Sequence, residues 1–172
     1  MPETQANEQA FYPGPELRGL LEQGVLASGD VARKGECLGA VLAHLESASH
    51  TIQGPRPTTA ILSLEYALMQ VGNAIALVFK RSIENKPASA GAHEIGARIV
   101  VAYCRQRHPE LVADALLAYP LVTRRNDYAY RHEPVNEDEV KRLGRAVRNL
   151  YAGLRDEIVA NTHFELERPR QS

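Results

Sequence analysis

Apolar residues recur at intervals of three and four along most of this chain, which is the spacing of one face of an α-helix. Alternating apolar and polar runs flanked by turn residues, which would indicate strands, are not found in the sequence. The pattern predicts helices over about residues 16–27, 30–53, 58–85, 91–107, 110–118 and 136–162. We therefore expect an all-α fold, an up-and-down helical bundle of about five main helices.

The third of these helices has the longest apolar stripe, so we expect it to be the central member of the bundle. Thr58 or Thr59 is the expected N-cap, because a threonine hydroxyl can accept a hydrogen bond from the first free backbone N–H groups. Small residues would let a second helix, or a partner chain, approach this helix closely. They are Ala60, Ala67, Gly72 and Ala74.

Three polar residues interrupt the same apolar helix: Glu65, Gln70 and Asn73. Polar side chains on a helix most often mark its solvated edge, and this is the favoured interpretation here. The alternative is functional, since a carboxylate on a central helix can orient the arginine of an active site. Both interpretations stay open at this point.

Composition places the chain among ordinary globular proteins. Its 172 residues fit one domain, with 44% hydrophobic residues, 24% charged residues and a formal net charge of −1. We expect a flexible arm over residues 1–15, the bundle over 16–162 and a tail over 163–172. Cys37 and Cys104 lack a metal-binding spacing and are expected to be reduced packing residues. With neither a signal peptide nor an uncharged membrane-spanning run, the expected location is cytoplasmic, without membrane contact.

The densest group of polar residues is the segment 124–132, Arg-Arg-Asn-Asp-Tyr-Ala-Tyr-Arg-His, which we call the polar segment. A guanidinium binds phosphate through several donors, an imidazole transfers protons near neutral pH, and a phenol can stack on a base. These residue types together indicate chemistry on a phosphodiester or a nucleotide. The structural alternative is a solvated loop between two helices, with Arg and Tyr side chains lying over the edge of the bundle.

The last helix has a well-defined start. Asn136 is the expected N-cap, and Glu139 follows three residues later as in a capping box. Lys141, Arg145 and Arg148 share one face of this helix and form a basic stripe just after the polar segment. The stripe is either an exposed helix face or a guide for a nucleic-acid backbone.

A helical bundle of this length, with Arg125, Asn126, Tyr130 and His132 just before the final amphipathic helix, resembles the HEPN superfamily of nucleotide- and RNA-associated domains. HEPN proteins carry an Arg, commonly followed by Asn or another polar residue, and then a His after four to six intervening positions. Six residues separate Arg125 from His132 here. The resemblance covers roughly residues 17–159, and its specific part is the polar segment. Tyr130 stands where many active members have the His.

The resemblance implies a homodimer in which two polar segments face each other, and metal-independent RNA cleavage that uses no cofactor. Arg125 would stabilise the charge that develops on the phosphate, and His132 would transfer a proton. The substrate-binding residues would be Arg124, Asn126, Tyr130 and Arg131, with Lys141, Arg145 and Arg148 along the RNA backbone.

Two other functions remain open from the sequence. The chain could be a non-catalytic HEPN domain that binds a nucleotide or another ligand, which Tyr130 at the usual His position favours. It could also be a helical dimer that binds another protein, such as an antitoxin. In the ribonuclease hypothesis given above, by contrast, this protein would itself be the toxin of a toxin–antitoxin or defence system.

Overall fold

The computed structural model describes residues 13–27, 31–54, 57–83 and 91–167. Nearly all of this part of the chain is helical, and the predicted all-α helical bundle is confirmed. The helices are α2 (Pro15–Leu21), α3 (Val31–Thr51), α4 (Thr58–Val78), α5 (Ala92–Arg107), the 3₁₀ helix η1 (Pro109–Leu111), α6 (Val112–Ala118), α7 (Leu121–Tyr130) and α8 (Glu137–Glu167).

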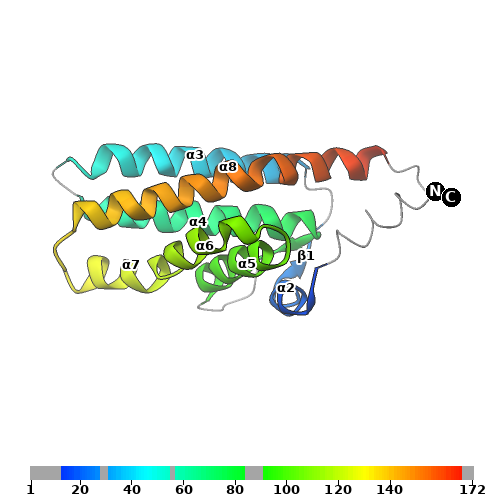
Figure 1. Cartoon of the computed structure of the whole chain (residues 1–172), viewed down its shortest axis with the longest axis horizontal. Helices are drawn as coiled ribbons and strands as arrows, with labels where there is room; N and C mark the ends of the chain where they lie inside the picture. Colours follow the sequence, from blue (N-terminus) through cyan, green and yellow to red (C-terminus); the bar gives the residue numbers. More distant parts are fainter. Residues whose placement is uncertain (1–12, 28–30, 55–56, 84–90, 168–172) are drawn as a thin grey trace.

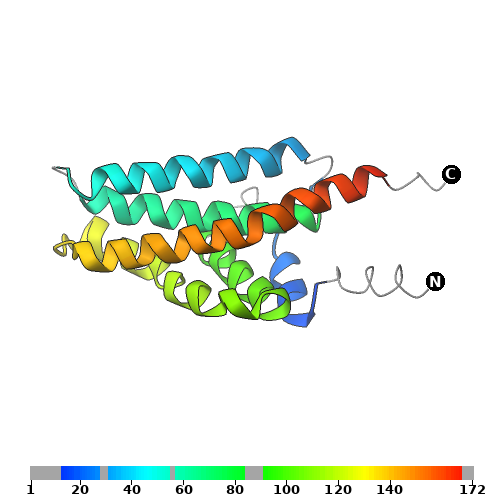
Figure 2. The same ribbon diagram turned by 45° about the horizontal axis from the view of Figure 1, so that its top comes forward.

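Helix α4 is the central member of the bundle, as predicted. The long helices α3, α4 and α8 run side by side, and α5, α6 and α7 pack along one side of this layer (Figures 1 and 2). Helix α4 contacts α3, α5, α7 and α8, and its apolar side chains, among them Ile61, Leu68 and Ile75, are almost fully buried. Burying an aliphatic side chain of this size contributes roughly 1.5–3 kcal/mol, so the α4 stripe is the main source of core stability.

Helix α4 is also long and apolar enough to cross a membrane when judged by length and composition alone. Most of this stretch is buried by the surrounding helices of the same chain. Its hydrophobicity is therefore explained by its place at the centre of the bundle.

Gly72 brings α4 and α5 into backbone contact. A Cβ atom at Gly72 would lie 2.3 Å from the carbonyl oxygen of Gly96, closer than any real Cβ contact. Ala60, Ala67 and Ala74 of the same helix have 0% exposure. The small residues of α4 are thus used for packing inside one chain, and the expectation that they leave a surface for a partner chain is wrong.

The N-terminal part of the bundle differs from the prediction. Helix α2 ends at Leu21, and the chain then forms the strand β1 (Val25–Leu26), which pairs antiparallel with β2 (Arg81–Ser82). The predicted helix 16–27 is therefore too long. The small sheet could not be predicted, because strands of two residues are too short to show an alternating pattern. Helix α4 begins at Thr58 with Pro57 at the N-cap and no side-chain capping bond, so the predicted threonine cap is also wrong. Of the predicted arm, residues 1–12 lie outside the described part.

The polar segment is helical, which corrects its interpretation as an inter-helical loop. Helix α7 spans Leu121–Tyr130, and its buried residues Leu121 and Tyr128 pack it onto the bundle. This burial outweighs the weak helix propensity of Asn126 and Asp127. The start of α8 agrees with the prediction, since Asn136 Oδ1 accepts hydrogen bonds from the backbone N–H groups of Asp138 and Glu139 at 3.0 and 3.2 Å.

The remaining expectations concern the cysteines and the C-terminus. Cys37 and Cys104 are both buried, in agreement with their expected packing role. Burial raises the pKa of the Cys104 thiol to about 12, with Glu110, Asp114 and Glu157 adding to the shift. Helix α8 continues to Glu167, past the boundary expected at residue 162.

Candidate functional site

Glu65 is a carboxylate buried at the centre of the bundle. It lies in the middle of α4, only 1% of its surface is exposed, and its Oε1 atom is hydrogen-bonded to Nδ1 of His93 from α5. The backbone contact between Gly72 and Gly96 draws α5 onto α4 and so brings His93, one turn before Gly96, to Glu65. The expectation of a solvated edge is therefore wrong for Glu65, and equally for Asn73, which is 3% exposed.

Arg125 approaches the second oxygen of the same carboxylate from α7. Its Nε lies 4.0 Å from Glu65 Oε2, which is an ion-pair distance but too long for a hydrogen bond. Within the described residues neither of these two buried atoms has a hydrogen-bond partner. The alternative in which a central carboxylate orients an active-site arginine thus matches the geometry.

Tyr66 joins two histidines and Arg125 next to this carboxylate. The imidazole of His44, from α3, stacks on the phenol with ring centroids 5.5 Å apart and planes at 20°. His93 meets the same ring edge-on at 5.5 Å, and the guanidinium carbon of Arg125 lies 5.8 Å from its centroid. We call these five residues, His44, Glu65, Tyr66, His93 and Arg125, the Glu65 site. The side chains of His93 and Arg125 are 30% and 27% exposed, so the site reaches the surface.

Arg124, which was predicted to contact substrate, is held by acidic neighbours instead. Its guanidinium donates to Tyr128 Oη at 3.0 Å and to Glu139 at 3.3 Å, and it pairs with Glu133 and Asp127 at 3.4 and 3.5 Å. These contacts tie α7 to the start of α8. With three carboxylates around it, Arg124 adds little positive charge to the surface, so its contacts do not favour the predicted substrate-binding role.

Among the described residues, no hydrogen bond, ion pair or ring contact joins Arg125 to another predicted residue of the polar segment. Arg131 is exposed and pairs with Asp127 at 3.1 Å, while Asn126 is exposed and Tyr130 is 74% exposed. His132 is exposed and adopts a left-handed backbone conformation with φ 54°, just after α7 ends. Arg125 lies within α7 and His132 lies beyond its end, and among the described residues no hydrogen bond or ring contact joins the two side chains.

The basic stripe of α8 belongs to a different part of the surface. Lys141 and Arg148 line a groove of about 200 Å³ between α3, α4 and α8, with Leu64 in its floor, and Arg148 donates to Ser49 Oγ at 2.5 Å. Arg145 is exposed. Leu64 lines this groove, whereas Glu65 belongs to the Glu65 site. Successive residues of a helix point about 100° apart, so the groove and the Glu65 site lie on different sides of α4.

His44 and His93 are the members of the site that the sequence did not reveal. A single histidine on a helix is usually a packing residue, so the sequence alone does not mark His44 or His93 as functional. In the described residues no three His, Cys, Asp or Glu side chains are grouped so that they could hold a metal ion. The one available signal was a charged residue, Glu65, inside the most apolar helix of the chain.

Comparison with known proteins gives this site no precedent: no family model matches the chain, and no curated protein or solved structure matches it either.

Proposed function

We propose that this protein is a HEPN-like, metal-independent endoribonuclease whose active site is the Glu65 site. The observation that carries the proposal is the arrangement of one buried carboxylate between an imidazole and a guanidinium, with one carboxylate oxygen and the arginine Nε left without hydrogen bonds. Buried polar groups normally have partners, and exceptions gather at functional sites. The HEPN resemblance of Arg125 and Asn126 supports the same function.

Glu65 acts as a positioning residue in this proposal. It fixes the His93 ring through Nδ1, which leaves Nε2 as the nitrogen that can face a substrate. It also attracts Nε of Arg125, so that the terminal nitrogens of the guanidinium are the donors available to a phosphate. The two groups that would act on a phosphodiester are thus held by one rigid carboxylate on the central helix.

The reaction would be an attack of a ribose 2′-OH on the adjacent phosphorus atom. The 2′-oxygen loses its proton, a bond forms to phosphorus, and the bond to the 5′-oxygen breaks as that oxygen takes up a proton. His93 would transfer one of these protons, and Arg125 would stabilise the additional negative charge on the phosphate oxygens. The products would be a 2′,3′-cyclic phosphate and a free 5′-OH.

A non-catalytic nucleotide-binding domain is the second candidate function. It is favoured by the exposed positions of Tyr130 and His132, neither of which contacts Arg125. In this case Arg125 and His93 would bind the phosphate without cleavage.

Homodimerisation, a cytoplasmic location and control by an antitoxin belong to the same proposal. A dimer interface would have to use a surface other than the small-residue side of α4, which is buried within the chain.

The test is cleavage of a labelled total-RNA pool by purified protein in excess EDTA. We expect cutting by the wild-type protein and a loss of about 10²–10⁴-fold in Arg125→Ala and in His93→Ala. Arg155→Ala is the matched control, because Arg155 is an exposed arginine on α8 that pairs only with its neighbour Asp156 among the described residues. His132→Ala should cut like the wild-type protein.

Three results would contradict the proposal in different ways. No cutting by folded wild-type protein would favour the nucleotide-binding function. Activity that depends on His132 but not on His93 would return the active site to the polar segment. Activity that EDTA abolishes would show that the reaction needs a metal ion.

A further inference from the structure

His44 occupies a position that packing alone does not explain. It projects from α3 onto one ring of the Glu65 site, where it stacks on Tyr66, and its side chain is partly exposed. No acidic side chain pairs with it in the part of the chain that the structure describes, in contrast to His50 on the same helix, which lies 3.8 Å from Glu46. The imidazole nitrogens of His44 are therefore not committed to an ion pair.

Tyr66 places His44 and His93 in one site although they come from helices α3 and α5. Each imidazole lies 5.5 Å from the centroid of the same phenol, one stacked and the other edge-on, and Arg125 is the third group around that ring. The charged or titratable groups that face this point are Glu65 and Tyr66 from α4, His93 from α5 and Arg125 from α7. His44, His93 and Arg125 thus surround one phenol ring, and imidazole and guanidinium groups both bind phosphate oxygens.

We infer that His44 is a second ligand-contacting imidazole of the Glu65 site, and that His44 and His93 bind a nucleotide phosphate from two sides while Arg125 contacts its oxygens. The inference rests on the proposed function for the location of the site and adds a residue to it. In RNA cleavage two protons move, one from the 2′-oxygen and one to the 5′-oxygen. Two imidazoles can divide these transfers, one accepting and the other donating, so that no proton has to come from bulk water.

Binding of cytidine 3′-monophosphate, followed by NMR of the histidine Cε1–H signals, tests the contact without any need for cleavage. We expect the signals of both His44 and His93 to shift as the nucleotide is added, and the signal of His50 to stay in place. Arg125→Ala should weaken binding by about tenfold or more, because it removes a charge-assisted contact to the phosphate. A shift of His93 without a shift of His44 would overturn the inference.

Cleavage kinetics show whether His44 contacts the ligand or only stacks on Tyr66. His44→Phe keeps an aromatic ring on Tyr66 but has no ring nitrogen, and we expect it to cleave RNA about 10²-fold more slowly while its melting temperature stays near that of the wild-type protein. His44→Ala should be equally slow, and the control His50→Ala should be unchanged. Wild-type rates in His44→Phe would show that His44 only packs, which overturns the inference.

The two proposals fail in distinguishable ways. If both imidazole signals shift but the wild-type protein does not cut RNA, the ribonuclease function is wrong and the two-histidine nucleotide site stands. If the wild-type protein cuts RNA while His44 neither shifts nor matters for the rate, the ribonuclease function stands and the role of His44 is wrong.

Discussion

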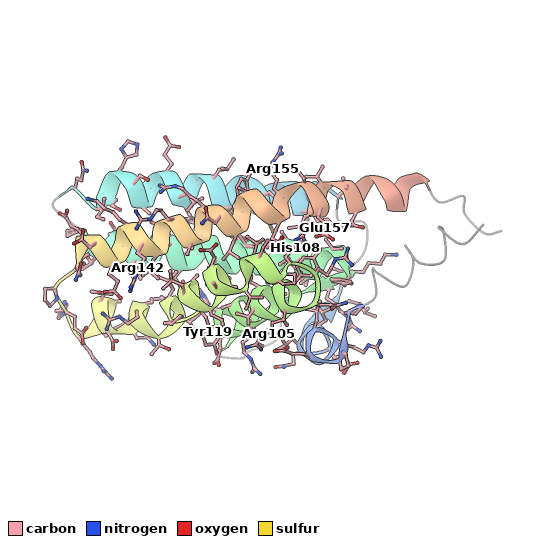
Figure 3. All side chains as sticks on the ribbon, in the orientation of Figure 1. Arg105, His108, Tyr119, Arg142, Arg155 and Glu157 are labelled. Atoms are coloured by element: carbon pink, nitrogen blue, oxygen red, sulfur yellow. The ribbon has the colours of Figure 1, made fainter. Side chains whose placement is uncertain are left out.

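Helix α5 has a Glu–His–Arg cluster at each end, and the two clusters differ in one respect. At its start, Glu65 of α4 meets His93 and Arg125. At its end, Glu157 of α8 meets His108 and Arg107, and Figure 3 shows His108 and Glu157 side by side. The second group, Arg107, His108 and Glu157, is called the Glu157 cluster below. The same three residue types are thus used twice.

The difference lies in the hydrogen bonds of the carboxylate. In the Glu157 cluster Oε1 accepts from Arg107 Nε at 2.6 Å and Oε2 is bonded to His108 Nε2, so both oxygens are satisfied. At Glu65 only Oε1 has a bond, and Arg125 stops 4.0 Å from Oε2. An unmade bond at a buried polar atom costs about 1–3 kcal/mol, so folding alone favours the arrangement around Glu157. The comparison supports the proposal that the Glu65 site, with its incomplete carboxylate, is the one that binds a ligand.

Replacing each glutamate by glutamine should separate the two roles most clearly. Glu65→Gln should lower RNA cleavage by about 10²–10³-fold, because the neutral amide no longer attracts Arg125 or fixes His93 as strongly. Glu157→Gln should cleave within about threefold of the wild-type rate under conditions where it is folded. Equal losses of activity in both variants, measured on folded protein, would break the distinction between the clusters.

The backbone contact that places His93 should be the most sensitive point for stability. Gly72→Ala would push a methyl group to within 2.3 Å of the Gly96 carbonyl, and neither helix can yield without losing core contacts. We expect the free energy of unfolding to fall by about 3 kcal/mol in urea denaturation. Gly35→Ala on α3 is the matched control: its Cβ would meet nothing within 4 Å, so it should raise stability by about 0.5–1 kcal/mol.

The Glu157 cluster should stabilise the folded protein, and this contribution should depend on pH. Burial alone would raise the pKa of Glu157, but the hydrogen bonds and charges of His108 and Arg107 outweigh it and hold the pKa below the ordinary value. A carboxylate whose pKa is lowered by folding stabilises the folded state above its ordinary pKa, and this contribution is lost as the pH falls through the lower, folded-state value. Glu157→Gln should therefore cost about 1–3 kcal/mol at pH 7.

The pH dependence of the free energy of unfolding tests this role of Glu157. Urea denaturation at several pH values below about 4.5 should show a smaller acid-induced loss of stability in Glu157→Gln than in the wild-type protein. If the two proteins lose stability in parallel over this range, the Glu157 cluster does not stabilise the fold in the way its geometry indicates.

The sequence predicted the elements that depend on local periodicity. The helices α3, α4, α5 and α8 were predicted correctly, because the buried face of an amphipathic helix shows in the spacing of its own apolar residues. Within the stripe of α3, however, Leu42 is 51% exposed. The polar segment was misjudged, since Asn126 and Asp127 favour turns and only the burial of Leu121 and Tyr128 keeps them helical.

Only part of the candidate site could be predicted from the sequence, because its other members join it through long-range contacts. Arg125 and the possible role of Glu65 could be inferred from their residue types in an apolar context. The importance of His93 depends on a hydrogen bond to a residue 28 positions earlier, and His44 joins the site only through Tyr66. Contacts of this range depend on how α3, α4 and α5 pack together and leave no pattern in a single sequence.

His132 gives the smallest expected effect and separates the sequence prediction from the structural one. It sits just past the C-terminus of α7 at φ 54°, a conformation that glycine adopts without strain and a residue with a Cβ does not. His132→Gly should therefore raise the free energy of unfolding by up to about 1 kcal/mol and leave RNA cleavage unchanged. Lys80→Gly, at φ 58° after α4, should give a similar gain and serves as the control. If His132 is catalytic, the His132→Gly protein will instead be stable but unable to cleave RNA. The missing hydrogen bond at Glu65 Oε2 would then need a different explanation.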